Sequence, residues 1–365
     1  MKKNKSLYKR LPSRLAVILV GVSLLIACAP INPNNAPENP NLDFPQTPLP
    51  PLPGTFQTAL LNPLDTPRTY IEETCRYLRS KWNPANARPG TVVMIILIKN
   101  INRGTAELPE SISLVEFGTL MEQLKAQGYE AIDTRQFQAF MERNIEIPPR
   151  SVLLIQDGNQ SAEYFDRNFR DYFDRWGWPI VNGWVSEPEI SETLLRENIT
   201  LEYEGFIDHQ ARGISPGTTL SDESGKTVIA RELQGSLAGF AEQFGKTPTA
   251  IVWPNGGFGI RPVEAARQLR FKLGFTGNPR GPVMYNWVPL ADLPDPDRPA
   301  LIPEGPVNDP LMTLPTYSPN EAFAAIDLVR AIGKEAAAYA EASKAAEHKY
   351  YEIVCEETYG PMPTP

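Results

Sequence analysis

The sequence predicts an α/β fold built on a parallel sheet. Continuous apolar runs such as Thr91–Ile98 (TVVMIILI) are typical of strands that are buried on both faces. Amphipathic helical patterns alternate with these runs, giving at least six strand–helix units. Strands joined through helices lie parallel, with right-handed crossovers. Periodicity alone leaves open whether the sheet stays open or closes into a barrel.

Caps and apolar spacing define the elements of the first half. Ser113 and Glu116 can form a capping box, and Gly128 stands where the following helix would end. The pattern of residues 162–176 places its aromatic side chains on one face, so Trp176 is expected to pack in the core. The elements expected here are the strands 91–98, 151–155 and 180–185 and the helices 113–128, 134–142 and 162–176.

The second half follows the same rules. Pro262 lies near the start of one helical pattern and Gly274 after it, and Ser318 precedes a last, Ala-rich pattern. The elements expected here are the strands 203–207 and 249–253 and the helices 228–244, 262–273 and 318–349. No GxGxxG or phosphate-binding loop follows any strand, so nucleotide binding is not expected.

The N-terminus is typical of an exported lipoprotein. Basic residues precede the uncharged run Leu15–Ala27, which suits a signal peptide and is short for a membrane span. The run ends Leu25-Ile26-Ala27-Cys28, which resembles a bacterial lipobox. Residues 1–28 are therefore assigned as a lipoprotein signal peptide with Cys28 as the lipidated residue, which predicts an extracytoplasmic, membrane-anchored protein. Cleavage near Ala27 to give a secreted protein, or an uncleaved anchor, are the alternatives.

A proline-rich segment follows the signal peptide. Residues 30–54 hold nine prolines and five asparagines, a composition that favours an extended spacer or a disordered tether. We assign residues 29–64 to this tether and 65–358 to one folded domain. The net charge of −8 argues against a nucleic-acid or anionic-lipid partner.

Two cysteines flank the expected domain. Cys75 lies close to its start and Cys355 close to its end. In an oxidising compartment a disulfide between them is expected to clamp the two ends of the fold. The alternative is two buried free thiols.

Polar residues follow three of the expected strands. They are Gln156-Asp157-Gly158, the run from Asp208-His209 to Gly213, and Trp253-Pro254-Asn255-Gly256. In parallel α/β folds the functional site lies where strands end at their carboxyl edge. No serine nucleophile motif or Cys–His pair accompanies them.

The order and spacing of these segments resemble the polysaccharide deacetylases, the NodB-homology or carbohydrate esterase family four. The resemblance covers residues 90–331. It rests on four segments: ISLVEFGTLMEQLKAQGYEAI, IPPRSVLLIQDG, RELQGSLAGFAEQFGKTPTAIVWPNGGFG and AARQLRFKLGFTGNP. It implies a distorted (β/α)7 barrel with flanking N- and C-terminal helices. It also implies hydrolysis of an N-acetyl group by a metal-activated water.

The resemblance places an incomplete catalytic set at the strand ends. In the family one Asp is the general base, and a second Asp and two His hold the metal. Here Gln156 stands at the base position, Asp157 and His209 match metal ligands, and Gly213 stands at the second His position. A catalytic zinc site normally needs three protein ligands, so we expect either no metal or a weakly held divalent metal such as zinc.

Other positions bear on the same question. Lys99 and Thr316 replace a His and an Arg that are common in relatives, and His348 is the only other histidine. Asp208 or Asn159 could supply a further ligand. Alternatively, Asp157 caps a strand end and His209 is a hydrogen-bonded histidine beside Asp208.

The third strand end resembles the segment that forms the substrate wall in the family. Aromatic faces stack on sugar rings, so Trp253 is a candidate for the cleft, with core packing as the alternative. Pro254, Asn255 and Gly256 could keep part of this surface. The resulting hypothesis is an envelope lipoprotein that binds cell-wall, extracellular or peptidoglycan-type polysaccharide with impaired or absent catalysis. The alternatives are an active metal-dependent deacetylase of amino-sugar polymers and an envelope scaffold protein.

Overall fold

The computed structural model describes residues 50–104 and 111–364. The chain divides into Met1–Pro48 and Leu49–Pro365, and the description concerns the second unit. The predicted signal peptide, the predicted lipidation site Cys28 and most of the predicted tether lie outside the described residues. Among the described helices, none combines the length and hydropathy needed to cross a membrane.

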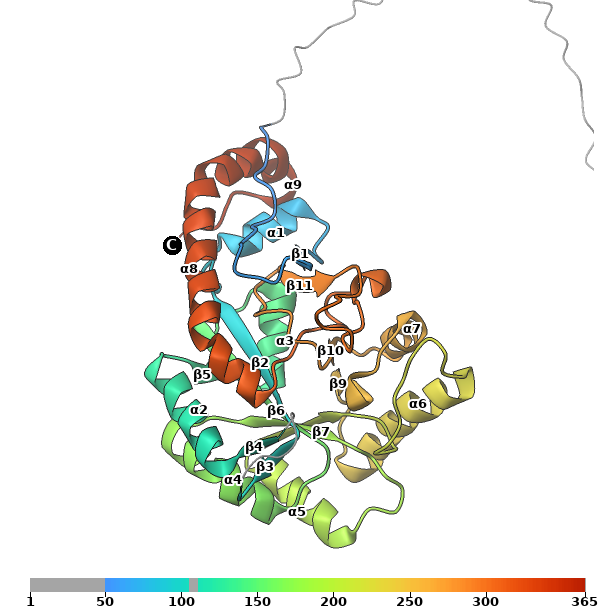
Figure 1. Cartoon of the computed structure of the whole chain (residues 1–365). Coiled ribbons are helices and arrows are strands. Elements are labelled where there is room, and N and C mark those ends of the chain that lie inside the picture. The colour runs from blue at the N-terminus through green and yellow to red at the C-terminus, as the bar shows by residue number, and fades with distance from the viewer. Residues whose placement is uncertain (1–49, 105–110, 365) are drawn as a thin grey trace, which may run out of the picture. The chain divides into compact units, whose positions relative to one another are not determined.

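A sheet of parallel strands forms the centre of the fold (Figure 1). In spatial order its main strands are β2 (Val92–Ile98), β6 (Arg150–Asp157), β7 (Ile180–Trp184), β8 (Ile207–Ala211), β9 (Ala250–Val252) and β10 (Leu273–Phe275). A short strand, β5 (Glu130–Ala131), also pairs with β6. The predicted parallel sheet is therefore present.

Residues 314–317 connect the two edges of this sheet. Beside β10, the Leu314 amide donates to the Gly274 carbonyl at 2.8 Å, and the Thr276 amide donates to the Leu314 carbonyl at 2.9 Å. Beside β2, the Tyr317 amide donates to the Ile95 carbonyl at 2.8 Å. These bonds complete a ring of seven chain segments. The distorted (β/α)7 barrel implied by the resemblance is thus confirmed.

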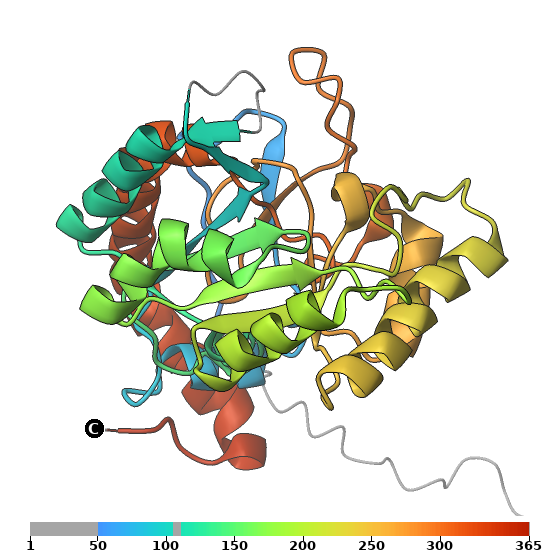
Figure 2. The same cartoon turned by 90° about the horizontal axis from the view of Figure 1, so that it is seen from below.

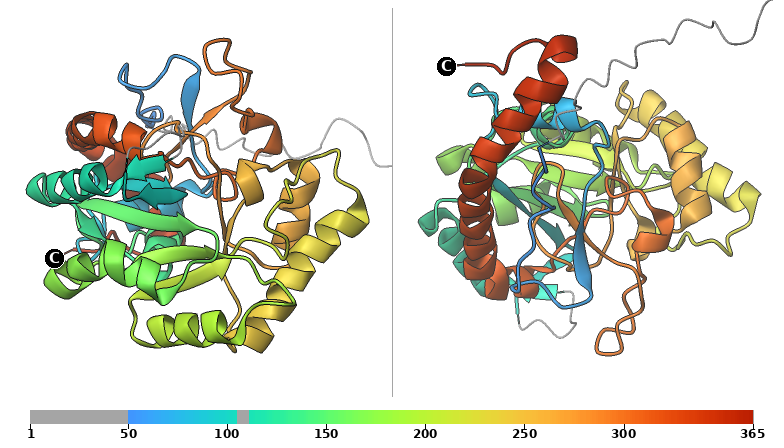
Figure 3. Two further views of the ribbon diagram at one scale, coloured as in Figure 1. Left: turned by 60° about the horizontal axis from the view of Figure 1, so that its bottom comes forward. Right: turned by 90° about the horizontal axis from the view of Figure 1, so that it is seen from above.

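Helices surround the barrel, as Figures 2 and 3 show from three directions. They are α1 (Thr74–Lys81), α2 (Leu114–Ala126), α3 (Thr134–Arg143), α4 (Ala162–Trp176), α5 (Glu192–Tyr203), α6 (Lys226–Gln243), α7 (Ile260–Gln268), α8 (Pro319–Tyr350) and α9 (Glu356–Tyr359). Helix α8 runs beside β2, and α6 and α7 lie on the other side of the barrel (Figure 1). Two further strand pairs lie outside the barrel: β1 (Asp65–Arg68) with β11 (Val288–Ala291), and β3 (Asn100–Asn102) with β4 (Ser111–Ser113).

Each barrel strand sends alternate residues to opposite sides of the sheet. Leu153, Ile155 and Val252 belong to the apolar cluster that fills the barrel interior. Val152 and Leu154 pack instead against the surrounding helices. This alternation decides which residues at the strand ends can meet.

Most expected element boundaries agree with the structure. The Ser113–Glu116 capping box opens α2, and α4 covers the expected residues 162–176. Trp176 packs at the edge of the core cluster, as predicted.

Two expected elements are wrong. Tyr203 ends helix α5, which the sequence analysis did not expect, and the following strand starts only at Ile207. The buried residues of α5 include Asn198, so the helix lacks the apolar stripe by which helices are recognised. Helix α7 ends at Gln268, because Arg270 adopts a left-handed conformation (φ 70°), and Gly274 lies in β10 and caps no helix.

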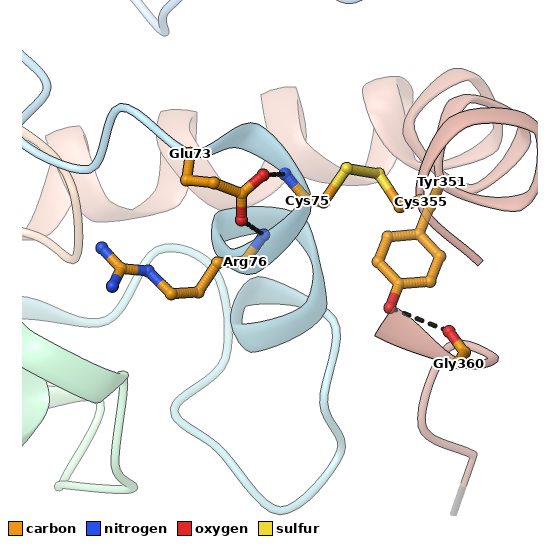
Figure 4. Close-up of a disulfide and its surroundings, with 6 residues drawn as sticks. All are labelled: Glu73, Cys75, Arg76, Tyr351, Cys355 and Gly360. Carbon is orange, nitrogen blue, oxygen red and sulfur yellow. Dashed lines mark hydrogen bonds between the residues drawn. A yellow bond between two sulfur atoms is a disulfide. The ribbon is translucent and has the colours of Figure 1, made fainter. Parts of the chain in front are cut away.

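The disulfide between Cys75 and Cys355 is present (Figure 4). It joins helix α1 to the π-helical turn Tyr351–Cys355 that follows α8, with the two Cα atoms 5.4 Å apart. The Glu73 carboxylate caps α1 by accepting from the amides of Cys75 at 2.9 Å and Arg76 at 2.6 Å. The predicted clamp between the two ends of the domain is confirmed.

Candidate functional site

The carboxyl ends of three strands bring together one polar cluster. Asp157 is the last residue of β6, Arg212 directly follows β8, and Asn255 follows β9. All three come from the strand ends that the sequence analysis selected, although Arg212 itself was assigned no role there.

The Asp157 carboxylate forms an ion pair with Arg212. Arg212 donates from Nε to Asp157 Oδ1, and the two side chains are 7% and 5% exposed. The same guanidinium donates from Nη1 to the Pro216 carbonyl at 3.1 Å and from Nη2 to Asn255 Oδ1 at 3.2 Å. The positive charge beside Asp157 is therefore supplied by the chain itself.

Gln156 takes no part in this cluster. Its side chain is fully buried and accepts a hydrogen bond from the Tyr164 hydroxyl of α4 at 2.8 Å. Its amide donates to the carbonyls of Lys99 and Asp157, both at 3.1 Å. The residue at the family's base position thus ties β6 to α4, and an amide cannot accept a proton near neutral pH.

His209 lies between the barrel and the helix layer. The residue is fully buried, with Nδ1 2.7 Å from Glu202 Oε2 and Nε2 2.9 Å from Asn198 Oδ1, both of α5. Its ring stacks on Phe244, with the centroids 4.7 Å apart. Burial lowers the pKa of His209 and outweighs the opposing effect of Glu202, so the ring is held in its neutral form.

The structure does not bring Asp157 and His209 together. His209 in β8 and Arg212, directly after β8, stand three positions apart along extended chain and so point to opposite sides of the sheet. Arg212 points to Asp157, whereas both ring nitrogens of His209 already have partners in α5. The pair of metal ligands implied by the resemblance is therefore not formed.

The other positions considered for a metal site also have structural contacts that prevent them from acting as ligands. Gly213 has φ 107°, and a Cβ atom there would lie 3.0 Å from Glu232 Oε2. Asn159 exchanges two 2.8 Å hydrogen bonds with the backbone of Val185, and Asp208 accepts from Lys246 and Gln210. Within residues 50–104 and 111–364, no group of three or more His, Cys, Asp or Glu side chains could hold a metal ion. The residues at this site do not fit a catalytic zinc.

The remaining predicted positions lie elsewhere. His348, on α8, packs edge-on against Trp82 with the centroids 5.3 Å apart. Thr316, in the segment that closes the barrel, donates its hydroxyl to the Thr276 carbonyl at 2.5 Å. Both residues therefore have structural contacts away from Asp157.

Trp253 does not line the cleft. It is 1% exposed, packs in the apolar cluster outside the barrel, and donates its indole N–H to the Met312 carbonyl at 2.7 Å. Pro254 is buried as well, whereas Asn255 is exposed with φ 52° and precedes Gly256 at φ 72°. The candidate substrate wall is thus reduced to Asn255 and Gly256, without an aromatic platform.

Glu232 holds the loop after β8 in place through hydrogen bonds. It is fully buried in α6 and accepts hydrogen bonds from the amides of Ile214 at 3.0 Å and Ser215 at 3.1 Å, and from the Ser215 hydroxyl at 2.8 Å. Burial opposes ionisation, but these hydrogen bonds prevail and lower the pKa of Glu232. In the sequence, Glu232 stands beside Leu233 on the apolar face of the predicted helix 228–244. An acidic residue on an apolar helix face is the signal that could have revealed this role.

Comparisons with known proteins bear on the fold of the described domain. No protein-family model matches the sequence, and no curated protein matches it. The Streptococcus pyogenes deacetylase PplD, solved with acetate, is similar in structure with a TM-score of 0.51 at 15% identity, over 66% of this chain and 99% of that one. The described domain has the fold of the polysaccharide deacetylases.

Two further solved structures were found with lower scores. A polysaccharide deacetylase from Bacillus cereus, BC0361, has a TM-score of 0.49 at 14% identity, over 65% of this chain and 69% of that one. IcaB from Ammonifex degensii has a TM-score of 0.48 at 14% identity, over 67% of this chain and 98% of that one. At such identities the likeness concerns the fold alone.

Proposed function

We propose that this chain is a lipid-anchored, extracytoplasmic protein that binds a polysaccharide through a deacetylase fold without hydrolysing it. The observation that carries the proposal is the ion pair between Asp157 and Arg212. A metal at this carboxylate would have to displace a guanidinium that has three acceptors. The neighbouring Gln156 has no group that could accept a proton from water.

Glycan binding is supported by the fold and by what remains exposed. The solved structures of similar fold include proteins named as deacetylases and as a polysaccharide deacetylase. At the strand ends of this chain, the exposed Asn255 is held by Arg212 and donates to the Thr218 carbonyl at 3.2 Å. The net charge of −8 disfavours polyanions, so a neutral or N-acetylated glycan is the better partner.

The membrane attachment rests on the sequence before residue 50. The basic and apolar N-terminus, the segment Leu25-Ile26-Ala27-Cys28 and the proline-rich spacer together support a lipid anchor at Cys28. Cys28→Ser should abolish the incorporation of labelled palmitate in cells and release the protein from membranes. Labelling that persists in this variant would refute the anchor.

The functional test combines binding and turnover. Full-length protein in detergent is titrated calorimetrically with N-acetylated chitooligosaccharides, and acetate release is measured after zinc or cobalt is added. Binding without acetate release is expected, and Gln156→Asp should remain inactive because it supplies a base without a metal site. Acetate release by the wild type would support the active deacetylase instead. Absence of binding to any glycan would overturn the proposal and favour the envelope scaffold.

A further inference from the structure

A cavity lies at the end of the barrel away from Asp157. It has a volume of about 330 Å³, and Gly90 and Thr91, directly before β2, form part of its wall. Asp157 lies at the other end of the parallel partner β6. Strand β2 has seven residues, so at ~3.3 Å per residue the cavity and the polar cluster are on the order of 20 Å apart. The cavity is thus separate from the candidate site described above.

Aromatic side chains from distant parts of the chain line this cavity. The rings of Tyr77 and Tyr285 are stacked with their centroids 5.9 Å apart. Phe56 lies with its centroid 5.8 Å from that of Trp287 and 5.6 Å from that of Tyr339. These five residues provide the apolar faces on which a planar or ring-shaped ligand can stack.

Hydrogen bonds hold the wall formed by residues 52–56 in place. The Trp287 indole donates to the Phe56 carbonyl at 2.9 Å, and the Tyr339 hydroxyl of α8 donates to the Gly54 carbonyl at 2.8 Å. The disulfide anchors α1, which carries the lining residue Tyr77. The cavity is therefore preformed, as small-molecule sites usually are.

One side-chain amide in the lining has a donor group without a protein partner. Asn286 is 4% exposed, and its Oδ1 accepts hydrogen bonds from the amides of Tyr70 and Ile71, both at 2.7 Å. In the described part of the chain, its Nδ2 donates to no group. This N–H group is therefore available to donate to an acceptor oxygen of a ligand in the cavity.

The charges around the cavity balance. Lys81 and Glu347 form a largely buried ion pair of 2.8 Å, and Trp82 donates to the same carboxylate at 2.6 Å. Glu72 and Arg88 stand at exposed positions of the lining. Two cations and two anions leave no net charge, so the cavity favours a neutral ligand.

We propose that this cavity binds one neutral sugar unit of a glycan. A sugar ring offers a C–H face for the aromatic rings and an oxygen-rich edge for Asn286 Nδ2. An acyl chain would satisfy neither the amide nor the polar rim. The volume is at the lower end of the range of about 300–1,000 Å³ for ligand pockets, which suits one or two rings. The inference rests on the proposed glycan binding and places it at the opposite end of the barrel.

The test uses three matched Asn→Asp substitutions in full-length protein. All three asparagines have left-handed φ angles, 53° at Asn286, 52° at Asn255 and 54° at Asn308, a conformation that Asp also tolerates. Asn286→Asp keeps the Oδ1 acceptor for the backbone of Tyr70 and Ile71 but removes the free donor. Asn255→Asp is the corresponding substitution in the polar cluster, where the lost Nδ2 group donates to the Thr218 carbonyl. Asn308→Asp is the control at an exposed residue that does not line the cavity.

N-acetylglucosamine and N,N′-diacetylchitobiose, which are both neutral, serve as calorimetric probes, and a thermal melt of each variant checks folding. Asn286→Asp should weaken binding by at least tenfold, whereas Asn308→Asp should bind like the wild type. If Asn286→Asp melts early, Tyr285→Leu, which removes a stacking face but stays apolar, should weaken binding by at least fivefold. Undiminished binding by these cavity variants, together with a loss in Asn255→Asp, would overturn the inference and leave the proposed function standing. No binding by the wild type would overturn both.

Discussion

Arg212, directly after β8, donates to the Asp157 carboxylate at the end of β6 and also donates from Nη2 to Asn255 Oδ1 at 3.2 Å. Both charged side chains are almost completely removed from solvent. One guanidinium thereby links the ends of β6, β8 and β9. It also supplies the positive charge that balances the Asp157 carboxylate, so this carboxylate needs no metal ion as a partner.

Removal of Arg212 should destabilise the fold. Arg212→Met leaves the buried Asp157 carboxylate unpaired, a change that typically costs about 3–5 kcal/mol. Arg212→Met combined with Asp157→Asn should recover a large part of this loss, because no unpaired charge then remains. Urea unfolding of the two single variants and the double variant measures the coupling. A cost below about 1 kcal/mol for Arg212→Met would show that the pair is not formed.

Gly213 should not accept the second histidine of the family. Its φ of 107° is unfavourable for any side chain, and a Cβ would crowd Glu232 at 3.0 Å. We expect Gly213→His to lower the free energy of unfolding by about 1–3 kcal/mol. Gly217→His is the matched control in the same loop, since a Cβ there meets nothing within 4 Å. Equal unfolding midpoints for the two variants in urea would contradict the prediction.

His209 should make the fold sensitive to mild acid. Burial lowers the pKa of His209 in the folded chain. Below about pH 6.5 this histidine is therefore protonated in the unfolded chain but not in the folded chain, so the free energy of unfolding falls as the pH falls. His209→Gln should therefore lose less stability than the wild type between about pH 7.5 and about pH 5.5. The lowered pKa of Glu202, which faces His209, acts only at more acidic pH.

The matched control for this experiment is His348→Gln. Burial also lowers the pKa of His348, together with the charge of Lys344, but this ring is less buried than that of His209. His348→Gln should keep most of the pH dependence of the wild type in urea unfolding. Parallel curves for the wild type and His209→Gln would exclude a buried neutral histidine.

The disulfide should contribute substantially to stability. It joins residues 280 positions apart, and bridges that close long loops restrict the unfolded chain most. Replacement of Cys75 and Cys355 by serine should cost about 2–5 kcal/mol in urea unfolding. Cys28→Ser, which leaves this bridge intact, should unfold like the wild type. Coincident unfolding curves for the wild type and the double serine variant would contradict this.

Local signals in the sequence were sufficient to predict most strands and helices, whereas the closed barrel was predicted from the family resemblance. The capping box of Ser113 and Glu116 and the apolar run of β2 require only neighbouring residues to be recognised. Helix α5 was missed because its buried face carries a polar residue, Asn198, which forms a hydrogen bond with His209.

The arrangement of the candidate site could not be predicted in the same way. Which side of the sheet His209 and Trp253 face depends on strand register, and a shift of one residue reverses every side chain. The partner of Asp157 lies 55 positions away, in a segment where the family resemblance drew attention to His209 and Gly213. Long-range pairing of this kind becomes visible only in three dimensions.

Zinc binding tests the central claim most directly. Full-length protein, purified without chelators and then titrated with zinc in a calorimeter, should show no stoichiometric site, and the Asp157→Ala variant should give the same result. Binding of one zinc ion per chain that is lost in Asp157→Ala would contradict the account, because it would show that the metal displaces Arg212 from this carboxylate.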